Sequence, residues 1–377
     1  MPNDHTTEHK ASESGAVATA VQELLQSVRQ GEPLHAGALQ FIPLLPATAY
    51  VKRQTGYLPL DEALRRDLIA ITEQAQEQVP ELLATSTAET PVILIGGEQV
   101  IGGLQNRVLN TTILVPAHAQ LHIPVTCVEA GRWHEAPTYA DPDVVDVTDS
   151  PSVEQKAGRA FTTDEAAYAK LRKLHAKSVT RSLSSGSGHR SDQSAVWGEV
   201  AERMAFSNSY SPSSAMQTLY KTPERAHKLK EIMDKLQPPD GALGFIAVLG
   251  SEVLGAELFA DEALAHAYWE KLARSYAVEA LDASQHTDDA APSGIAAVGQ
   301  ARLLEEALAA DIQIHPSPGL GADARLVGSH VAGAGLVYDG AVVHLSLFPD
   351  TPETTSTAAS DALQQLSRHL GYQHIHS

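Results

Sequence analysis

The sequence contains a single cysteine and has a large deficit of positive charge. Because Cys127 is its one cysteine, no disulfide can form within the chain, and a reducing compartment is expected. The 27 Lys and Arg residues stand against 46 Asp and Glu residues, a formal net charge of -19 at pH 7. Nonspecific binding to nucleic acid needs a positive surface that displaces counterions, so we do not expect a nucleic-acid partner.

Long hydrophobic runs are also missing. No stretch approaches the roughly 18 apolar residues of a membrane span, and the first residues lack the apolar core of a signal peptide. Hydrophobic residues still make up 43% of the 377 residues, enough to bury more than one packed core. We therefore expect a cytoplasmic protein without a membrane partner, whose oligomeric state and cofactor stay open.

Common motifs of nucleotide and metal chemistry are absent as well. The sequence has no GxxxxGK[ST] phosphate loop, no GxSxG elbow, no HExxH and no paired CxxC. The stretch GAGLVYDG does not keep the GxGxxG order, so no Rossmann-type dinucleotide site is predicted. The spacing of His118, His122 and His134 matches no recognised ligand pattern, and no metal site is predicted.

Hydrophobic periodicity predicts an α+β protein. Short apolar runs separated by turn residues between positions 80 and 133 predict antiparallel strands, which favours a β-sandwich-like N-terminal region. Helical spacing then dominates from residue 162, and GALGFIAVLGSEVLGAELF (241–259) is expected to form a hairpin of two apolar strands. Two helices and further strands complete a second β-rich region flanked by helices.

These patterns divide the chain into five segments. In order, we expect a flexible tail (1–16), a β-rich N-terminal region (17–140), a linker and helical insert (141–237), a β-rich region with two helices (238–350) and a C-terminal helix and tail (351–377). The insert is expected to open with the helix TTDEAAYAKLRKLHAKSVTRSL, where a Thr cap precedes an acidic first turn.

The densest group of polar residues in an apolar setting lies in GEQVIGGLQNR (97–107) and CVEAGRWHE (127–135). If the run between them is a hairpin turning near Pro116, the two segments meet at one end of a sheet. The side chains brought together would be Glu98, Gln105, Asn106, Arg107, Cys127, Glu129, Arg132 and Trp133. Guanidinium groups suit phosphate, amides suit ribose or base edges, and an indole suits stacking, so a nucleotide-like ligand is one interpretation. Ion pairs that merely hold the corner are the other.

Cys127 is a candidate nucleophile if a neighbouring histidine acts as its base. Strand alternation weakens this hypothesis, because Cys127, Val125 and Ile123 share one face of the strand while His122 lies on the other. A small buried residue on an apolar face is the alternative.

An internal similarity links LIGGEQVIGG (94–103) with VLGSEVLGAE (248–257). Both segments can be hairpin turns in which Gly supplies a positive φ. Alternatively, they place Glu98 and either Glu252 or Glu257 at comparable points of a repeated β unit.

Several segments resemble, in order, the family of uncharacterised proteins associated with ADP-ribosylglycohydrolases and rhodanese-like phosphatases. They include GGEQVIGGLQNRVLNTTILVP, IPVTCVEAGRW, VLGSEVLGAELF and VVHLSLFP, and the resemblance runs from about residue 40 to 350. The sequence departs from the family pattern at Gln99, where an acidic residue is common, and at Leu104, where a lysine is common.

The resemblance implies a role in ADP-ribose or NAD-linked metabolism. We therefore expect binding of a nucleotide or ADP-ribose-like anionic small molecule and, if the protein is an enzyme, hydrolysis or transfer of part of that ligand. Glu98 and Glu129 are the candidate general acid and base. The candidate ligand-binding side chains are Gln105, Asn106, Arg107, Arg132 and Trp133. The alternative is a non-catalytic ligand-sensing or protein-interaction scaffold whose polar corner is structural.

Overall fold

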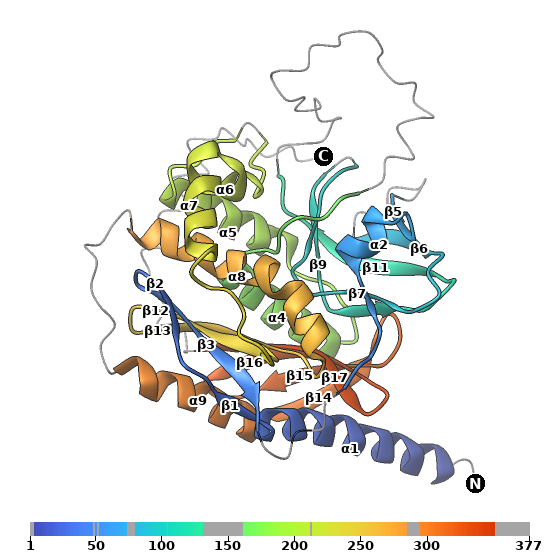
Figure 1. Ribbon diagram of the computed structural model, residues 1–377. Helices are drawn as coiled ribbons and strands as arrows, with labels where there is room; N and C mark the ends of the chain where they lie inside the picture. The colour runs from blue at the N-terminus through green and yellow to red at the C-terminus, as the bar shows by residue number, and fades with distance from the viewer. Residues whose placement is uncertain are drawn as a thin grey trace, which may run out of the picture.

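Figure 1 shows the computed structural model of the protein. It describes residues 4–47, 50, 53–73, 80–103, 105–130, 161–211, 213–284 and 295–350. Helices and largely antiparallel sheets alternate along this part of the chain, which confirms the expected α+β class. The expected linker at 141–160 and the C-terminal helix after residue 350 lie outside the described residues.

The largest sheet is antiparallel. Among the described residues its strands follow the order β1, β3, β12, β13, β17, β16, β15, β14, with β2 added beside β3. The strands are β1 (Val28–Gln30), β2 (Leu34–Ala36), β3 (Leu39–Pro46), β12 (Gly244–Leu249), β13 (Glu252–Leu258), β14 (Asp311–Pro316), β15 (Ala322–Val327), β16 (Val331–Tyr338) and β17 (Ala341–Pro349). The predicted hairpin at 241–259 is confirmed, because β12 and β13 pair from Gly244↔Leu258 to Leu249↔Glu252.

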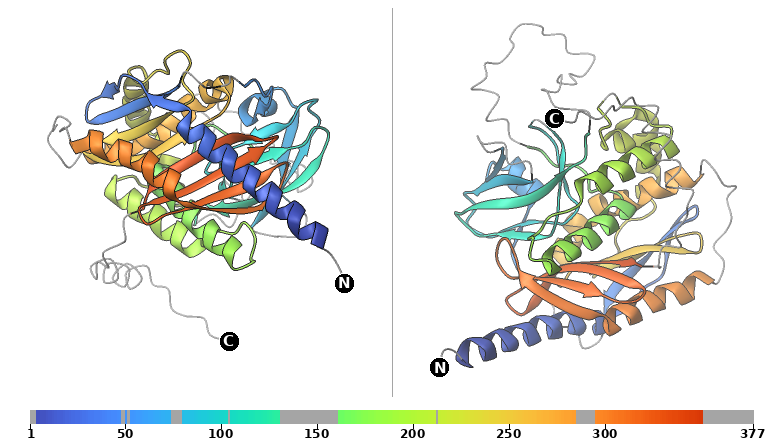
Figure 2. Two further views of the ribbon diagram at one scale, coloured as in Figure 1. Left: turned by 90° about the horizontal axis from the view of Figure 1, so that it is seen from below. Right: turned by 180° about the vertical axis from the view of Figure 1, so that it is seen from behind.

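Helices cover both faces of this sheet, which explains why β12 reads as a continuous apolar run. Figure 2 shows α1 (Asp4–Gln26) and α9 (Ile295–Ala309) along one face. The other face carries α4 (Ala169–Ser184) and α8 (Glu262–Ser284). On that face Phe41 stacks on Phe245 with ring centroids 4.4 Å apart, and Trp269 of α8 meets Phe245 edge-on at 4.8 Å.

Two helices begin at unexpected residues. Helix α1 starts at Asp4, so residues 4–16 are helical where a flexible tail was expected. Helix α4 starts at Ala169, several residues after the predicted Thr cap. The reason is that Thr162 and Ala166 form β-bridges with Ile101 and Glu98, so this segment meets its backbone hydrogen-bonding needs outside a helix.

Two smaller sheets are built from residues 58–127. One contains β10 (Ile113–Val115), β7 (Val92–Leu94) and β4 (Leu58–Pro59), and the other β5 (Ile69–Thr72), β6 (Glu81–Ser86), β11 (Gln120–Cys127), β9 (Arg107–Leu109) and β8 (Gln99–Val100). Both sheets contribute to one hydrophobic core together with the short helix α2 (Leu60–Arg65). The strands expected to form one N-terminal region therefore belong to different sheets, because β1, β2 and β3 are part of the large sheet. A β-sandwich here stays a prediction.

The later helices of the insert begin at residue types that favour helix starts. The insert contains α4, α5 (Gln193–Phe206), α6 (Thr218–Lys221) and α7 (Pro223–Met233). Asp192 caps α5 by accepting hydrogen bonds from the backbone N–H groups of Ser194 and Ala195. Thr222 caps α7, and Pro223 occupies its first turn, where a missing N–H costs no hydrogen bond. In the described chain no helix is both long and apolar enough to cross a membrane.

Candidate functional site

The two polar segments singled out in the sequence do meet, although not through the expected hairpin. Strand β11 pairs with β9, which places Cys127 opposite Arg107. The intervening β10 instead pairs with β7 in another sheet. The chain therefore leaves one sheet after Leu109 and returns to it with β11, so the segments become neighbours through a longer connection than a simple hairpin.

The resulting polar corner consists of Gln105, Asn106, Arg107, Cys127 and Glu129. Gln105 Nε2 donates to the backbone carbonyl of Glu129 at 3.1 Å, and the Asn106 N–H donates to the Glu129 carboxylate at 3.2 Å. Arg107 Nη2 lies 3.2 Å from a Glu73 carboxylate oxygen. All five side chains of the corner are buried. Gln105, Asn106 and Glu129 thus bind one another, which favours the structural interpretation for these three residues. Arg107 Nε and Nη1 are buried and have no hydrogen-bond partner within the described chain. Arg132 and Trp133 lie outside the described residues.

The surroundings of Cys127 also favour a structural role. Its thiol donates to Gln105 Oε1 at 3.0 Å, and burial raises the pKa of the thiol. A raised pKa keeps the thiol protonated at neutral pH, whereas a nucleophile needs the thiolate. His118 and His122 lie at the surface beside Glu89 and Glu81. A nucleophilic Cys127 stays a prediction without support from these contacts, and His134 lies outside the described residues.

Glu98 does not belong to the polar corner. It is fully buried, and one carboxylate oxygen accepts the N–H of Ile95 at 3.2 Å. The other oxygen accepts a hydrogen bond from Thr163 Oγ1 at 3.1 Å and contacts the ammonium of Lys271. Glu98 therefore faces helix α8 and not Arg107.

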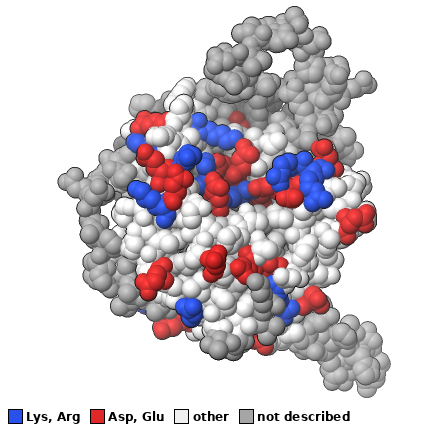
Figure 3. All heavy atoms as spheres, viewed as in Figure 1, with Lys and Arg blue, Asp and Glu red and all other residues white. Residues whose placement is uncertain are grey.

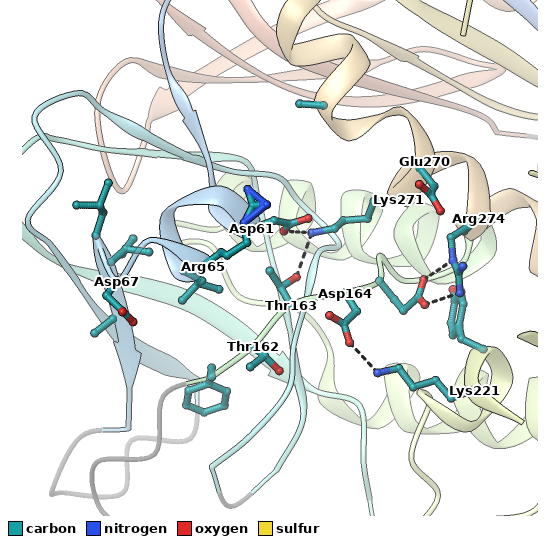
Figure 4. A pocket seen from close by; sticks show the side chains of 18 of the residues that line it. Asp61, Arg65, Asp67, Thr162, Thr163, Asp164, Lys221, Glu270, Lys271 and Arg274 are labelled. Carbon is teal, nitrogen blue, oxygen red and sulfur yellow. Dashed lines mark hydrogen bonds and ion pairs between the residues drawn. The ribbon is translucent and has the colours of Figure 1, made fainter. Parts of the chain in front are cut away.

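Lys271 connects this buried carboxyl to an open surface. Its side chain is 5% exposed, and its ammonium also contacts Asp61 of α2 and lies 3.2 Å from Thr163 Oγ1 (Figure 4). Burial raises the pKa of Glu98 to about 7, although Lys271 lowers it. Burial lowers the pKa of Lys271, but Glu98 and Asp61 together raise it more. Burial thus favours the acid form of Glu98, while the ammonium of Lys271, held between two carboxyl groups, stays charged.

Lys271, Asp61 and Thr163 line a cleft of about 1120 Å³. Its walls are α2, the segment 161–165, the α6 end and α8 (Figure 4). The charged side chains that line it are Asp61, Arg65, Asp67, Asp164, Glu165, Lys221, Glu270, Lys271 and Arg274. Because ligand pockets usually measure about 300–1,000 Å³, this cleft has room for a dinucleotide-sized molecule.

Ion pairs tie the walls of the cleft together on one side. Lys221 Nζ lies 2.7 Å from an Asp164 oxygen, and Arg274 binds Glu165 through two hydrogen bonds of 3.0 and 2.7 Å. Figure 3 shows acidic and basic side chains mixed in a band at the level of α2 and α8, above a mostly uncharged surface. The cleft thus offers both signs of charge to a ligand.

A second buried network lies on the large sheet around Glu257. This carboxylate accepts hydrogen bonds from Tyr276 at 2.6 Å and Ser346 at 2.8 Å. Arg172 Nη1 approaches it to 2.6 Å and His344 Nε2 to 2.9 Å. Burial raises the pKa of Glu257, but Arg172 and His344 lower it further, to about 2. Of the two glutamates suggested by the internal similarity, Glu257 is therefore the buried one, while Glu252 is exposed.

The sequence motifs did not identify the basic residues of the cleft, Arg65, Lys221, Lys271 and Arg274. A signal for Lys271 exists, because it lies three residues after the buried Tyr268 and four before the buried Ser275, on the inward stripe of α8. A charged residue on such a stripe requires a buried partner. The partner, Glu98, lies 173 residues away in the sequence, and no local pattern identifies it.

Fold and site together define an α+β protein with a large cleft of mixed charge beside a buried carboxyl group. The chain belongs to the family described as ARG and Rhodanese-Phosphatase-superfamily-associated Protein domain (ARPP-1), whose model matches residues 27–348. This confirms the family expected from the sequence motifs. The family name points to an association with ADP-ribosylglycohydrolases. No curated protein and no solved structure matches the chain.

Proposed function

We propose that the protein binds a nucleotide or ADP-ribose-like anionic small molecule in the cleft between α2, the segment 161–165 and α8. The observation that supports this proposal is a fully buried carboxyl group, Glu98, which accepts a hydrogen bond from Thr163 in the wall of a cleft of about 1120 Å³. The association in the family name supports the same class of ligand.

The charges of the cleft suit such a ligand in two ways. Arg65 and Lys221 have side chains that are 67% and 42% exposed, so both can move to bind phosphate oxygens. The carboxylates of Asp61 and Glu270 line the same cleft and can accept hydrogen bonds from ribose hydroxyls. A ligand with phosphate at one end and sugar hydroxyls beside it satisfies both sets of groups.

If the ligand is hydrolysed or transferred, Glu98 is the group best suited to move a proton. A general acid or base works best when its pKa lies near the operating pH, and burial brings the pKa of Glu98 to about 7. Thr163 Oγ1 contacts both Glu98 and Lys271 and lines the cleft, so it links the carboxyl to the ligand. Glu129 stays a second candidate acid or base predicted from the sequence.

The second candidate function is a non-catalytic ligand-sensing or protein-interaction scaffold. The buried and internally paired polar corner favours it, since Gln105, Asn106 and Glu129 bind one another. Under this alternative the cleft still binds its ligand, but the ligand leaves unchanged. Chromatography of ADP-ribose and NAD after incubation with the protein separates the two functions, because only an enzyme produces a new peak.

The binding proposal can be tested by titrating the purified protein with ADP-ribose, NAD and AMP in a calorimeter. Arg65 and Arg66 make a matched pair of variants, because both lie at the end of α2 and both pair with Glu62, but only Arg65 lines the cleft. We expect Arg65→Ala to raise the dissociation constant about tenfold or more, as for loss of a charged hydrogen bond, and Arg66→Ala to leave it unchanged.

Lys221 and Lys228 provide a second matched pair. Each ammonium lies 2.7 Å from one carboxylate and each side chain is roughly half exposed, but Lys228 is not among the described residues that line the cleft. Weaker binding by Lys221→Ala than by Lys228→Ala is expected. Equal binding by all four variants, or no heat with any of the three ligands, would reject the cleft as the site.

A further inference from the structure

A second and much smaller cavity, of about 20 Å³, lies where α4 meets the turn at Gly96 and Gly97 and strand β15. Arg172, His175 and Arg325 line it, and the three side chains are 4%, 2% and 0% exposed. A volume of this size holds one water-sized species. The cavity shares no lining residue with the large cleft, so what it binds is independent of the function proposed above.

The polar groups that line this cavity have unused hydrogen-bonding capacity. Within the described chain, Arg172 Nε, Arg325 Nη1 and both ring nitrogens of His175 have no hydrogen-bond partner. Buried polar groups are nearly always paired, so a set of three residues with unused nitrogens around one cavity indicates a bound species.

Both arginines bind carboxylates through other nitrogens, so Arg172 Nε and Arg325 Nη1 stay without a partner within the described chain. Arg325 binds Asp323 through Nε at 2.5 Å and through Nη2 at 2.6 Å. Arg172 contacts Glu257 through Nη1 and Ser346 through Nη2. Gly97, at φ +86°, gives Arg172 room, because a Cβ there would lie 2.7 Å from Arg172 Cγ. The guanidinium groups are thus fixed in place, and the remaining N–H groups are available to a ligand.

The cavity contrasts with the cleft in its charge. No Asp or Glu is among the described residues that line it, whereas acidic side chains line much of the cleft. The hydroxyls that line it are already engaged. Ser346 donates to Glu257 and Thr111 donates to Asp323, while Thr112 Oγ1 accepts the N–H of Gly96 and lies 3.0 Å from His344 Nδ1. Guanidinium N–H donors therefore dominate the lining, and such groups bind anions.

We infer that this cavity binds one single-atom anion of the size of chloride, held by Arg172, His175 and Arg325. Burial lowers the pKa of His175 to about 4, so its neutral ring offers one N–H donor and one acceptor nitrogen. A halide can accept hydrogen bonds from this N–H and from both guanidinium groups, whose positive charges favour an anion over a water molecule. Phosphate and sulfate exceed the cavity, which admits a single water-sized species. The anion would tie α4 to β15 and stabilise the packing of the helical insert on the large sheet.

The direct test is a crystal of the full chain grown in sodium bromide, with diffraction data collected at the bromine absorption edge. An anomalous peak within hydrogen-bonding distance of the Arg172, His175 and Arg325 nitrogens is expected. A water molecule refined there without an anomalous peak, or no density at all, would overturn the inference.

Thermal unfolding tests the same inference in solution. In sodium chloride the wild-type melting temperature should exceed that in sodium gluconate of equal ionic strength by about 2 °C or more. Ala334→Val fills the cavity and should abolish this difference, whereas Ala332→Val, on the same strand but not among the described lining residues, should keep it. His175→Leu serves as a second variant if Ala334→Val does not fold. Equal melting temperatures in the two salts for the wild type contradict the inference.

Discussion

Replacing Lys271 with methionine tests how the protein holds a buried carboxyl group beside its cleft. The substitution keeps much of the side-chain volume and removes the ammonium that contacts Glu98 and Asp61. Glu98 is 0% exposed, so it cannot recover hydration when its partner is gone. Asp61 can recover its hydration, because its side chain is 47% exposed.

The expected loss of stability equals the cost of removing one partner from a buried ion pair. Leaving one charge buried without its partner costs about 3–5 kcal/mol in the free energy of unfolding. At roughly 2.1 cal/mol/K per residue, the unfolding entropy of 377 residues is about 0.8 kcal/mol/K, so the melting temperature should fall by about 4–6 °C. Lys221→Met is the matched control, because this half-exposed pair should contribute at most about 1 kcal/mol.

The loss should depend on pH in a specific direction. The pKa of Glu98 is about 7 in the folded protein and 4.5 for the free side chain, so the folded state binds the extra proton between these values. The contribution of Glu98 to the free energy of unfolding therefore falls as pH rises from about 4.5 to about 7. Removing Lys271 raises this pKa further, so the variant should lose more stability at pH 8.5 than at pH 6.

Urea denaturation followed by circular dichroism at both pH values measures this effect. The double variant Lys271→Met, Glu98→Gln leaves no buried charge at the site and should recover most of the loss. A loss below about 1 kcal/mol at pH 8.5, or an equal loss at the two pH values, would show that Lys271 does not stabilise the buried charge of Glu98.

Three further predictions concern the rest of the buried polar groups. Glu257→Gln leaves Arg172 without its carboxylate and should cost about 3–5 kcal/mol in urea denaturation; since the pKa of Glu257 is about 2, its stabilisation of the wild type should be lost as pH falls from 4.5 toward 2. Cys127 should react slowly with a thiol reagent at pH 7 until urea unfolds the protein, and rapid labelling of the native protein would contradict its burial. Gly97→Ala should lower the melting temperature more than Gly188→Ala, because both have positive φ but only Gly97 would contact Arg172; equal losses would count against that contact.

The parts of the fold that depend on local patterns could be predicted from the sequence. The β12–β13 hairpin forms as predicted, where two apolar runs flank a Gly turn. Asp192 and Thr222, residue types that favour helix N-caps, cap α5 and α7. Local signals failed where a long-range partner competed with them. The Thr cap before α4 predicts a helix, but Thr162 pairs with Ile101 in a β-bridge, and Asp164 and Glu165 line the cleft instead of a first helical turn.

The site was only partly predictable for the same reason. The polar cluster and the family resemblance predict Glu98 as a candidate acid or base that lies beside Arg107. Arg107 pairs with Glu73, whereas Glu98 pairs with Lys271 of α8. Alternation along β9 and β11 predicts which residues of the polar corner meet, but not that buried partners already occupy them.

We propose that a nucleotide or ADP-ribose-like ligand binds the cleft and not the polar corner. Hydrogen–deuterium exchange of the wild-type protein with and without ADP-ribose tests it most directly. We predict slower exchange in peptides covering 60–70 and 161–165, which line the cleft, and unchanged exchange in 105–109. No change in any peptide, or slower exchange confined to 105–109 and 125–129, would contradict ligand binding in the cleft.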